Sequence, residues 1–264
     1  MVRSKSRFGS FIKMKDLYAV VLAGGKGTRM GGDTPKVLMN LAGKPIIYWC
    51  LNMLKKVGTK NIVVVVGYKS ESVKKVIKQF GFDVKFVKQT RQLGTANSLG
   101  VALKFIPKDI KNIFALFGDD SALYSSVTIE KFIRQHLSSK SKISIITIRK
   151  KIVQDIGGLK IDKKGNPIGV LFPSEIKQYR LKMIDILCGA FCFDADWLRK
   201  NLLLVRKNPR SGEYPLPSII EILFEKGDFA KAYKINDDEW NSINNHEELQ
   251  EANKKKLRQL KLKK

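Results

Sequence analysis

Short apolar runs of strand length alternate with amphipathic segments of helix length along the first 150 residues of this chain. The pattern predicts strands at residues 17–22, 61–66, 83–87, 112–117 and 142–148, with helices at 46–57, 71–80, 95–105 and 127–138 between them. The run at 61–66 is β-branched with few breaks, as in strands that helices cover on both faces. Such alternation is typical of βαβ units, so we expect an α/β fold in which a mostly parallel central sheet forms the middle of a three-layer αβα sandwich.

The second half of the chain has a different texture. Paired glycines at 157–158 and the turn-forming run at 162–167 predict hairpins, residues 186–193 a further strand, and residues 196–201, 217–226 and 247–260 helices. No repeat or long linker is present, so we expect one domain at 15–250, with a first half at 15–150 and a mixed, β-rich half at 151–250. A basic arm at 1–14, expected to be disordered, and a basic tail at 251–264 flank it.

The charge is unusual, because 50 lysines and arginines stand against 24 acidic residues, a formal net charge of +26. Such a surface attracts polyanions. Either the protein binds nucleic acid, or a lysine-rich background surrounds a site for small anions. The lysines are scattered outside the tail, and no nucleic-acid-binding module or interleaved aromatic pattern is recognisable, which favours the second interpretation. The tail itself is either a frayed helix end or a non-specific contact to polyanions.

Nothing in the sequence predicts a membrane or secreted protein. The longest apolar runs are far too short to cross a bilayer, and no apolar segment follows the basic N-terminus as in a secretory signal. The chain has an odd number of cysteines, Cys50, Cys188 and Cys192, and the sequence around them does not follow a metal-ligand pattern. We therefore expect reduced, buried thiols in a cytoplasmic protein.

Residues 22–38 read LAGGKGTRMGGDTPKVL and follow directly on the first predicted strand. A loop so rich in glycine costs backbone entropy to order. Glycines let backbone N–H groups approach anionic oxygens, and the lysines and arginine supply compensating charge, so the loop predicts a polyphosphate site. Since ligands of open α/β sheets bind at the carboxyl ends of strands, the segments at 88–97 and 117–120, which follow two other strands, are expected beside it.

These segments resemble a known family. LAGGKGTRM, PKVL and LAGKP, followed by QLGTANSL, GDD after a strand, CGAFCFDADWL, GEYPLPSII and WNSINNHEEL, are similar to the nucleotidyltransferase domain of sugar-nucleotide pyrophosphorylases, in particular those that make UDP-N-acetylglucosamine. The resemblance covers about residues 16–250, with the motifs in the family's order. It implies a Rossmann-like fold and a reaction in which a nucleoside triphosphate and a sugar 1-phosphate give an NDP-sugar and pyrophosphate, with Mg²⁺.

The resemblance also implies the residues of the site. Arg29, Lys36 and Asp119 would be catalytic, with Arg29 on the β- and γ-phosphates and Lys36 at the α-phosphate. Asp119 and Asn244 would bind Mg²⁺, and Gly158, Gly189 and Glu213 would shape the sugar side. The first half of the domain would thus bind the nucleotide and the second the sugar. The nucleotide would be bound by Leu22, Ala23, Gly24, Gly25, Lys26, Gly27, Thr28, Arg29, Lys36, Gln89, Gly94, Thr95 and Gly118, with Gln89 on the base edge.

Each assignment has a structural alternative. Asp119 could be a turn residue, since Gly-Asp after a strand is common turn chemistry. Lys36 could be one of many solvated lysines, and Asn244 could cap the last helix. Gln92 and Asn97 are interpreted as structural or supporting residues, and His136 as a surface or packing residue.

The acceptor half of the chain departs from the family pattern. Where many relatives carry an acidic residue and a lysine before proline, this chain has Leu171 and Phe172, and the segment after Glu213 carries Pro215 and Pro217. The acceptor therefore stays open between a sugar 1-phosphate and another phosphorylated alcohol. Bifunctional relatives add an acyltransferase β-helix, and since the chain ends at Lys264 we expect a single function.

Several functions remain as alternatives. UTP is favoured, giving UDP-GlcNAc or UDP-glucose, but thymine shares uracil's Watson–Crick edge, so dTTP stays open. A cytidylyltransferase stays open as well. Residues 29–33 also resemble a molybdopterin guanylyltransferase loop, although LAGKP and QLGT argue against that. A basic nucleic-acid-binding protein without catalysis, or a binding-only relative, is the alternative of another class. A homo-oligomer is also left open.

Overall fold

The computed structural model describes residues 16–27, 30–31, 33–139, 141–151, 157–171, 175–176 and 183–262. The predicted arm at residues 1–14 lies outside these ranges.

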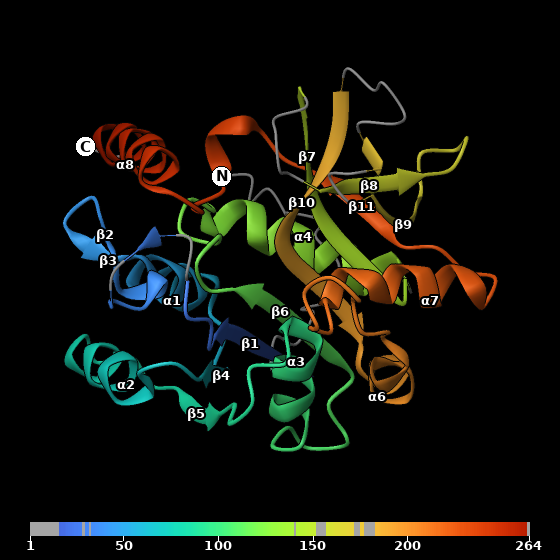
Figure 1. Ribbon diagram of the computed structural model, residues 1–264, viewed down its shortest axis with the longest axis horizontal. Coiled ribbons are helices and arrows are strands. Elements are labelled where there is room, and N and C mark those ends of the chain that lie inside the picture. The colour runs from blue at the N-terminus through green and yellow to red at the C-terminus, as the bar shows by residue number, and fades with distance from the viewer. Residues whose placement is uncertain are drawn as a thin grey trace, which may run out of the picture.

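A seven-stranded sheet runs through the middle of the molecule (Figure 1). The strands β6, β1, β4 and β5 are parallel neighbours, β10 is antiparallel to both β6 and β7, and β11 is parallel to β7. The predicted α/β fold with a mostly parallel sheet is therefore confirmed, and the second half of the chain contributes the one reversed strand of this sheet. In the order β11-β7-β10-β6-β1-β4-β5 the strands span Lys231–Lys234, Ile143–Lys151, Met183–Asp194, Asn112–Phe117, Leu17–Ala23, Asn61–Val66 and Lys85–Lys88.

Helices cover both faces of the sheet, as the sandwich requires. Strand β1 shows why: Val21 points into one apolar core with Leu51 of α1, while its neighbour Val20 points into a second core with Leu99 of α3. The first core also packs under α2 and α4, and the second under α6 and α7. The helices span Ile46–Val57 (α1), Ser70–Gln79 (α2), Thr95–Leu103 (α3), Ser126–Ser139 (α4), Ala195–Asn201 (α6) and Ile219–Glu225 (α7).

Smaller elements complete the second half and the sheet's edges. β8 (Gly158–Ile161) and β9 (Pro167–Leu171) form the predicted hairpin, and β2 (Asn40–Leu41) pairs with β3 (Lys44–Pro45) in another. The predicted helix at 217–226 is divided into a 3-10 turn at Leu216–Ser218, which contains Pro217, and the shorter helix α7. Further 3-10 turns span Lys36–Leu38, Leu202–Leu204 and Asp237–Glu239.

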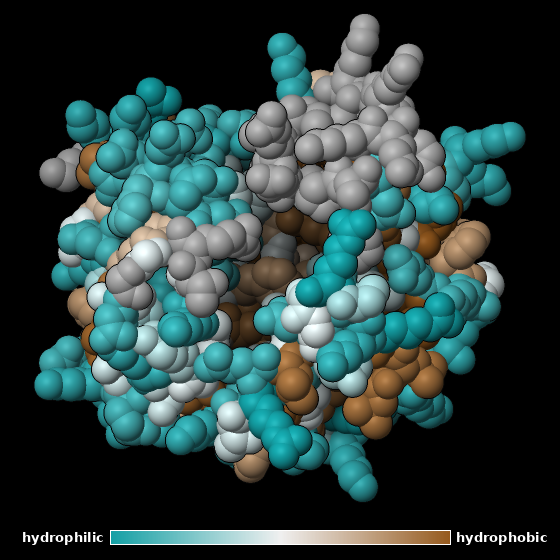
Figure 2. All heavy atoms as spheres, in the orientation of Figure 1, coloured by the Kyte–Doolittle hydropathy of each residue, from teal (hydrophilic) through white to brown (hydrophobic). Residues whose placement is uncertain are grey.

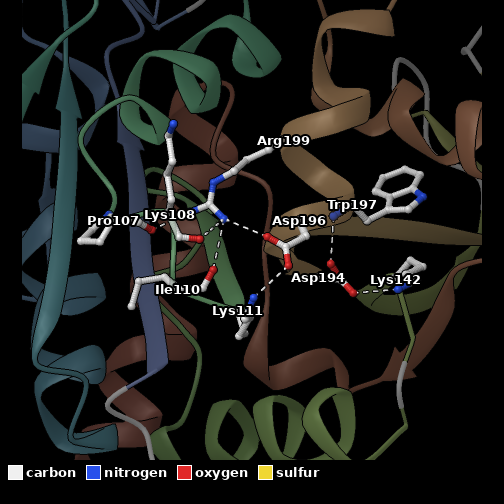
Figure 3. Close-up of polar contacts among 9 residues, drawn as sticks. All are labelled: Pro107, Lys108, Ile110, Lys111, Lys142, Asp194, Asp196, Trp197 and Arg199. Carbon is white, nitrogen blue, oxygen red and sulfur yellow. Dashed lines mark hydrogen bonds and ion pairs between the residues drawn. The ribbon is translucent and has the colours of Figure 1, made fainter.

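Figure 3 shows how the end of β10 is joined to α6. Asp194 caps α6, since its Oδ1 accepts from the Trp197 N–H at 2.9 Å while Oδ2 lies 2.7 Å from Lys142 Nζ. One turn later Arg199 donates to the backbone carbonyls of Pro107, at 2.8 Å, and Ile110, at 3.2 Å. These contacts tie the reversed strand and its helix to the loop that precedes β6.

The basic C-terminal segment continues α8 (His246–Lys261) and is docked on the body of the protein. Lys256 is buried, donates to the carbonyl of Ala122 at 2.7 Å and lies over the Trp49 ring, 4.4 Å from its centroid. Lys255 pairs with Asp237 at 2.8 Å. The expected boundary at residue 250 falls inside this helix, and residues 251–261 are part of the fold rather than a frayed end.

Two further expectations concern membrane-spanning helices and the cysteines. No helix in the described ranges is both long and apolar enough to cross a bilayer. Cys50, Cys188 and Cys192 are free and buried, as predicted. Burial and the nearby Asp119 carboxylate raise the pKa of the Cys50 thiol to about 12, which keeps it protonated and unreactive.

Candidate active site

The three segments singled out from the sequence meet at one edge of the sheet. They follow β1, β5 and β6, whose carboxyl ends open into a pocket of about 540 Å³, a volume in the range of small-molecule sites. Figure 2 shows a hollow near the centre of the molecule, with hydrophilic residues spread around it rather than gathered in one patch. The pocket brings together Leu22, Ala23, Gly24, Gly25, Lys26, Gly27, Lys36, Gln89, Gly94, Thr95, Asp119, Glu213 and Asn244.

The other candidates either do not line the pocket or lie outside the described ranges. Thr28 and Arg29 are not in the described part of the chain, so the phosphate role of Arg29 stays a prediction. Gly118 donates to the carbonyl of Leu22 at 2.9 Å, between the ends of β6 and β1. Gly189 has φ +69 at the irregular step of β10, where a Cβ would lie 3.0 Å from the Cβ of Phe117, a pocket residue.

Packing between β8 and β10 explains the glycine at position 158. A Cβ there would lie 1.9 Å from Ile184 Cδ1 and 2.3 Å from Ile184 Cγ1, so the Ile184 side chain of β10 packs directly against the bare backbone of β8. None of the three glycines Gly118, Gly158 and Gly189 lines the pocket, and the sugar-side role of the last two stays a prediction.

Lys36 is the centre of the site's charged group. It stands at the start of the 3-10 turn Lys36–Leu38, and only 8% of it is exposed. Its Nζ lies 2.7 Å from Asp119 Oδ2 and 3.7 Å from Asp120 Oδ1, and it donates to Asn244 Oδ1 at 3.4 Å. Residues far apart in the sequence thus place one ammonium group among three oxygens at the wall of the pocket.

The glycine loop makes room for this lysine. Gly27 has φ +68, a left-handed conformation that favours glycine, and a Cβ on it would lie 2.8 Å from the Cβ of Lys36. At the other end of the loop, Gly24 accepts from the Tyr68 N–H at 3.1 Å, and a Cβ on Gly67 would lie 2.6 Å from the Gly24 carbonyl oxygen. Bare backbone is therefore needed on both sides, where the loop contacts Lys36 and where it contacts the end of β4.

Backbone conformation and close packing explain why residue 94 is a glycine. Its φ is +96, and a Cβ there would lie 2.7 Å from the Tyr214 carbonyl oxygen. Tyr214 donates to Leu93 O at 2.8 Å and accepts from the Ala96 N–H at 2.9 Å. The hydroxyl of Thr95 accepts from the Leu216 N–H at 2.8 Å. Together these contacts bring Glu213 from the second half of the chain to the pocket.

Asn244 is positioned by the start of α8. Asn245 caps this helix by accepting from the Glu248 N–H at 2.8 Å, and Glu248 Oε2 accepts from the Asn244 N–H at 2.6 Å. The cap is therefore Asn245, and the amide oxygen of the neighbouring Asn244 accepts from Lys36 instead.

Sequence reasoning missed several residues at the site. Asp120, to which no role was assigned above, and Gln92, interpreted above as a structural or supporting residue, line the pocket with Met30, Val37, Ser98 and Phe117. Tyr68, which does not line the pocket, donates to Asp33 Oδ1 at 2.6 Å, and the pocket residue Lys26 lies 5.5 Å from the Tyr68 ring centroid. The hydrogen bond to Asp33 raises the pKa of Tyr68, and those from Lys69 and Tyr68 lower the pKa of Asp33. The position of Tyr68 just after β4 is the signal that could have identified it.

Three comparisons relate this chain to known proteins. Residues 19–185 match the model of the MobA-like NTP transferase domain. The chain is 34% identical over 235 residues to the bifunctional protein GlmU of Clostridium novyi (strain NT), with 89% of this chain and 51% of that protein covered. It is 30% identical over 241 residues to GlmU of Thermoanaerobacter pseudethanolicus, with 91% and 52% covered. The chain thus spans about half the length of the curated relatives it matches.

A solved structure shares the fold. It is a Bacillus anthracis protein described as a candidate glucose-1-phosphate thymidylyltransferase in complex with sucrose, and it superposes with a TM-score of 0.73 over 90% of this chain and 94% of that chain. At 19% sequence identity, the likeness concerns the arrangement of the elements.

Proposed function

Because the chain belongs to the MobA-like NTP transferase domain family and resembles GlmU, we propose that it is a uridylyltransferase acting on a sugar 1-phosphate. Its products would be pyrophosphate and a UDP-sugar, such as UDP-N-acetylglucosamine or UDP-glucose. One observation carries the proposal: the nearly buried Lys36 lies among oxygens at the wall of the pocket that the glycine loop lines.

The charge arrangement suits transfer of a nucleotidyl group. The acceptor phosphate is already a nucleophile, so the reaction needs positioning and neutralisation of charge more than a general base. Backbone N–H groups of the glycine loop would hold the triphosphate, with Lys26 at its edge. Lys36 would stabilise the extra negative charge at the α-phosphate in the transition state, and pyrophosphate would leave with the bonding electrons.

The oxygens around Lys36 also fit a magnesium ion. Mg²⁺ takes hard oxygen ligands, often only one or two from the protein, with phosphates and water completing the shell. Asp119 and Asn244 provide one carboxylate and one amide oxygen, and the described residues hold no group of three or more His, Cys, Asp and Glu suited to a metal. The ion would neutralise phosphate charge, while Asp119 and Asn244 would orient it and Lys36 would turn to the phosphate.

UTP and the sugar class rest on the sequence resemblance. Gln89 and Glu213 line the same pocket, which supports a proposal that one bound pair of substrates contacts both side chains. Leu171 is buried in β9, and Pro215 leads into the turn before α7, so neither position supplies the polar contact found in many relatives. The assay must therefore include several different sugar 1-phosphates.

The experiment is pyrophosphate release with Mg²⁺ across UTP, dTTP, CTP, GTP and ATP. Each nucleotide is paired with glucose, N-acetylglucosamine and galactose 1-phosphates. Release with UTP and one sugar supports the proposal and names the product. Release only with another nucleotide replaces the base assignment. If no pair releases pyrophosphate and no nucleotide binds, the enzyme function is contradicted. Nucleic-acid binding by the surface, with its net charge of +26, then becomes the favoured function.

Asp119→Asn tests the proposed metal contact. It should remove most turnover, and Mn²⁺ titrated into the UTP complex should show weaker binding by electron paramagnetic resonance. Asp109→Asn changes an exposed aspartate outside the pocket and is the control. Unchanged Mn²⁺ affinity in Asp119→Asn would contradict the metal assignment.

A further inference from the structure

Gln89 is held in one orientation at the wall of the pocket. It is only 5% exposed, and its Nε2 donates to the Gly94 carbonyl at 3.2 Å and to Asn97 Oδ1 at 2.8 Å. A backbone carbonyl can only accept a hydrogen bond, so the end of the carboxamide that faces Gly94 must be the nitrogen. Asn97, on the first turn of α3, adds the shorter of the two bonds that fix this orientation.

The other end of the carboxamide is directed at the glycine loop. A Cβ on Gly24 would lie 2.9 Å from Gln89 Oε1, and both residues line the pocket. Within the described part of the chain, no hydrogen bond engages Oε1. The pocket is thus offered an acceptor by Gln89 and no donor, because both N–H groups of Nε2 are directed away.

We infer that Asn97 sets the nucleobase preference of the pocket by holding Gln89 with its carboxamide oxygen toward the base. The inference rests on the proposed function and deepens it. Uracil, thymine and guanine carry a ring N–H at the centre of the Watson–Crick edge, which an acceptor can bind. Cytosine and adenine carry a lone pair there, which would face the lone pairs of Oε1.

Asn97 acts through Gln89, so it is a positioning residue. Without the acceptor of Asn97, the carboxamide would keep only the 3.2 Å contact to Gly94. Rotation that turns Nε2 toward the pocket would then break one hydrogen bond instead of two, and bases with a ring acceptor would be admitted. Asn97 itself is not among the residues that line the pocket.

The test compares UTP and CTP in three variants of α3. Asn97→Leu keeps the volume and removes the acceptor, Asn97→Asp keeps an acceptor for Gln89 Nε2, and Val101→Ala perturbs packing on the same helix as the control. Binding of each nucleotide is measured by calorimetry without acceptor, and kcat/KM is measured with it. Asn97→Leu should lower the UTP:CTP ratio on the order of tenfold to a hundredfold. Asn97→Asp and Val101→Ala should keep it.

The same substitution in a Gln89→Leu variant shows whether Asn97 changes the UTP:CTP ratio by acting on Gln89. In Gln89→Leu the preference should already be lost, and adding Asn97→Leu should change the ratio no further. If Asn97→Leu is poorly folded, Asn97→Ala is measured in the same two backgrounds.

The outcomes separate this inference from the proposed function. A wild-type protein that binds no nucleotide overturns both. A wild-type protein that prefers UTP, with the ratio unchanged in Asn97→Leu or lowered as much in Asn97→Asp, overturns the inference alone. A further loss from Asn97→Leu in the Gln89→Leu background overturns it too, because Asn97 would then act by another route.

Discussion

At the scale of single residues, Lys36 is the side chain on which most of the proposed chemistry depends. A nearly buried ammonium beside Asp119 is not explained by stability, since a buried ion pair loses solvation on folding. Lys36→Met should therefore lower kcat by about a hundredfold or more. Urea unfolding should change much less, because Asp119, with 30% of its side chain exposed, can be hydrated.

Lys74→Met is the matched control for that variant. Lys74 pairs with Glu71 on the surface of α2, a pair of the kind that contributes little to stability. It should leave kcat unchanged. If Lys36→Met retained kcat within a few-fold, the assigned role at the α-phosphate would be wrong.

His136 makes stability depend on pH although it lies outside the pocket. It is buried in α4, with Nδ1 2.9 Å from Ser144 Oγ, and burial lowers its pKa from 6.5 to about 4. Between these values the unfolded chain binds a proton that the folded protein excludes, so this contribution is complete above pH 6.5 and is lost as pH falls toward 4.

His136→Gln removes this titration and keeps a hydrogen-bonding side chain. From pH 7 to 4.5, the free energy of unfolding of the wild type should fall by about 2 to 3 kcal/mol more than that of the variant. Urea denaturation at several pH values measures the difference between the two curves. Parallel curves would contradict a histidine that is buried in its neutral form.

At the scale of elements, the cap of α6 tests how the reversed strand is anchored. Asp194→Ala removes the cap on the Trp197 N–H and the partner of Lys142, and it should cost about 0.5 to 2 kcal/mol. Asp196→Ala, in the first turn of the same helix, removes exposed pairs with Lys111 and Arg199 and should cost less than about 1 kcal/mol. Chemical denaturation ranks the two, and an equal or larger loss in Asp196→Ala would contradict the assigned cap.

The elements differ in how well sequence patterns predict them. Helix α1 and strands β4 and β6 have the predicted bounds, because their apolar periodicity is set by the local chain and both faces of the sheet are covered. The place of β10 between β6 and β7, and its reversal, could not be predicted in this way, because periodicity reports which residues are buried and not which strand lies beside them. The docking of α8 was missed for the same reason, since a lysine such as Lys256 gives no sign of the Trp49 ring that it meets.

The site shows the same division between local and distant information. The glycine loop and the segment at Gln89 could be predicted because each directly follows a buried strand. The contacts of Asp120 with Lys36 and of Tyr68 with Asp33 could not, because they depend on the geometry of loops brought together from different strands. The contact of Asn97 with Gln89 joins two residues of the one segment after β5, but it depends on the path of the turn at Gly94, which apolar periodicity does not report.

At the scale of the whole molecule, the pocket is assembled from both halves of the chain, from Leu22 to Asn244. The first half contributes the glycine loop and the acidic pair after β6, and the second contributes Glu213 and Asn244. A site of this kind is complete only when the entire domain is folded, so nucleotide binding should also report on global folding.

The most direct measurement of the central claim is the reverse reaction. The protein is incubated with Mg²⁺, pyrophosphate and UDP-N-acetylglucosamine, UDP-glucose or dTDP-glucose, and formation of the nucleoside triphosphate is followed by chromatography. The account predicts UTP and a sugar 1-phosphate from at least one UDP-sugar, and a loss of that activity in Lys36→Met. Absence of any triphosphate from all three substrates, with a folded protein, would contradict it.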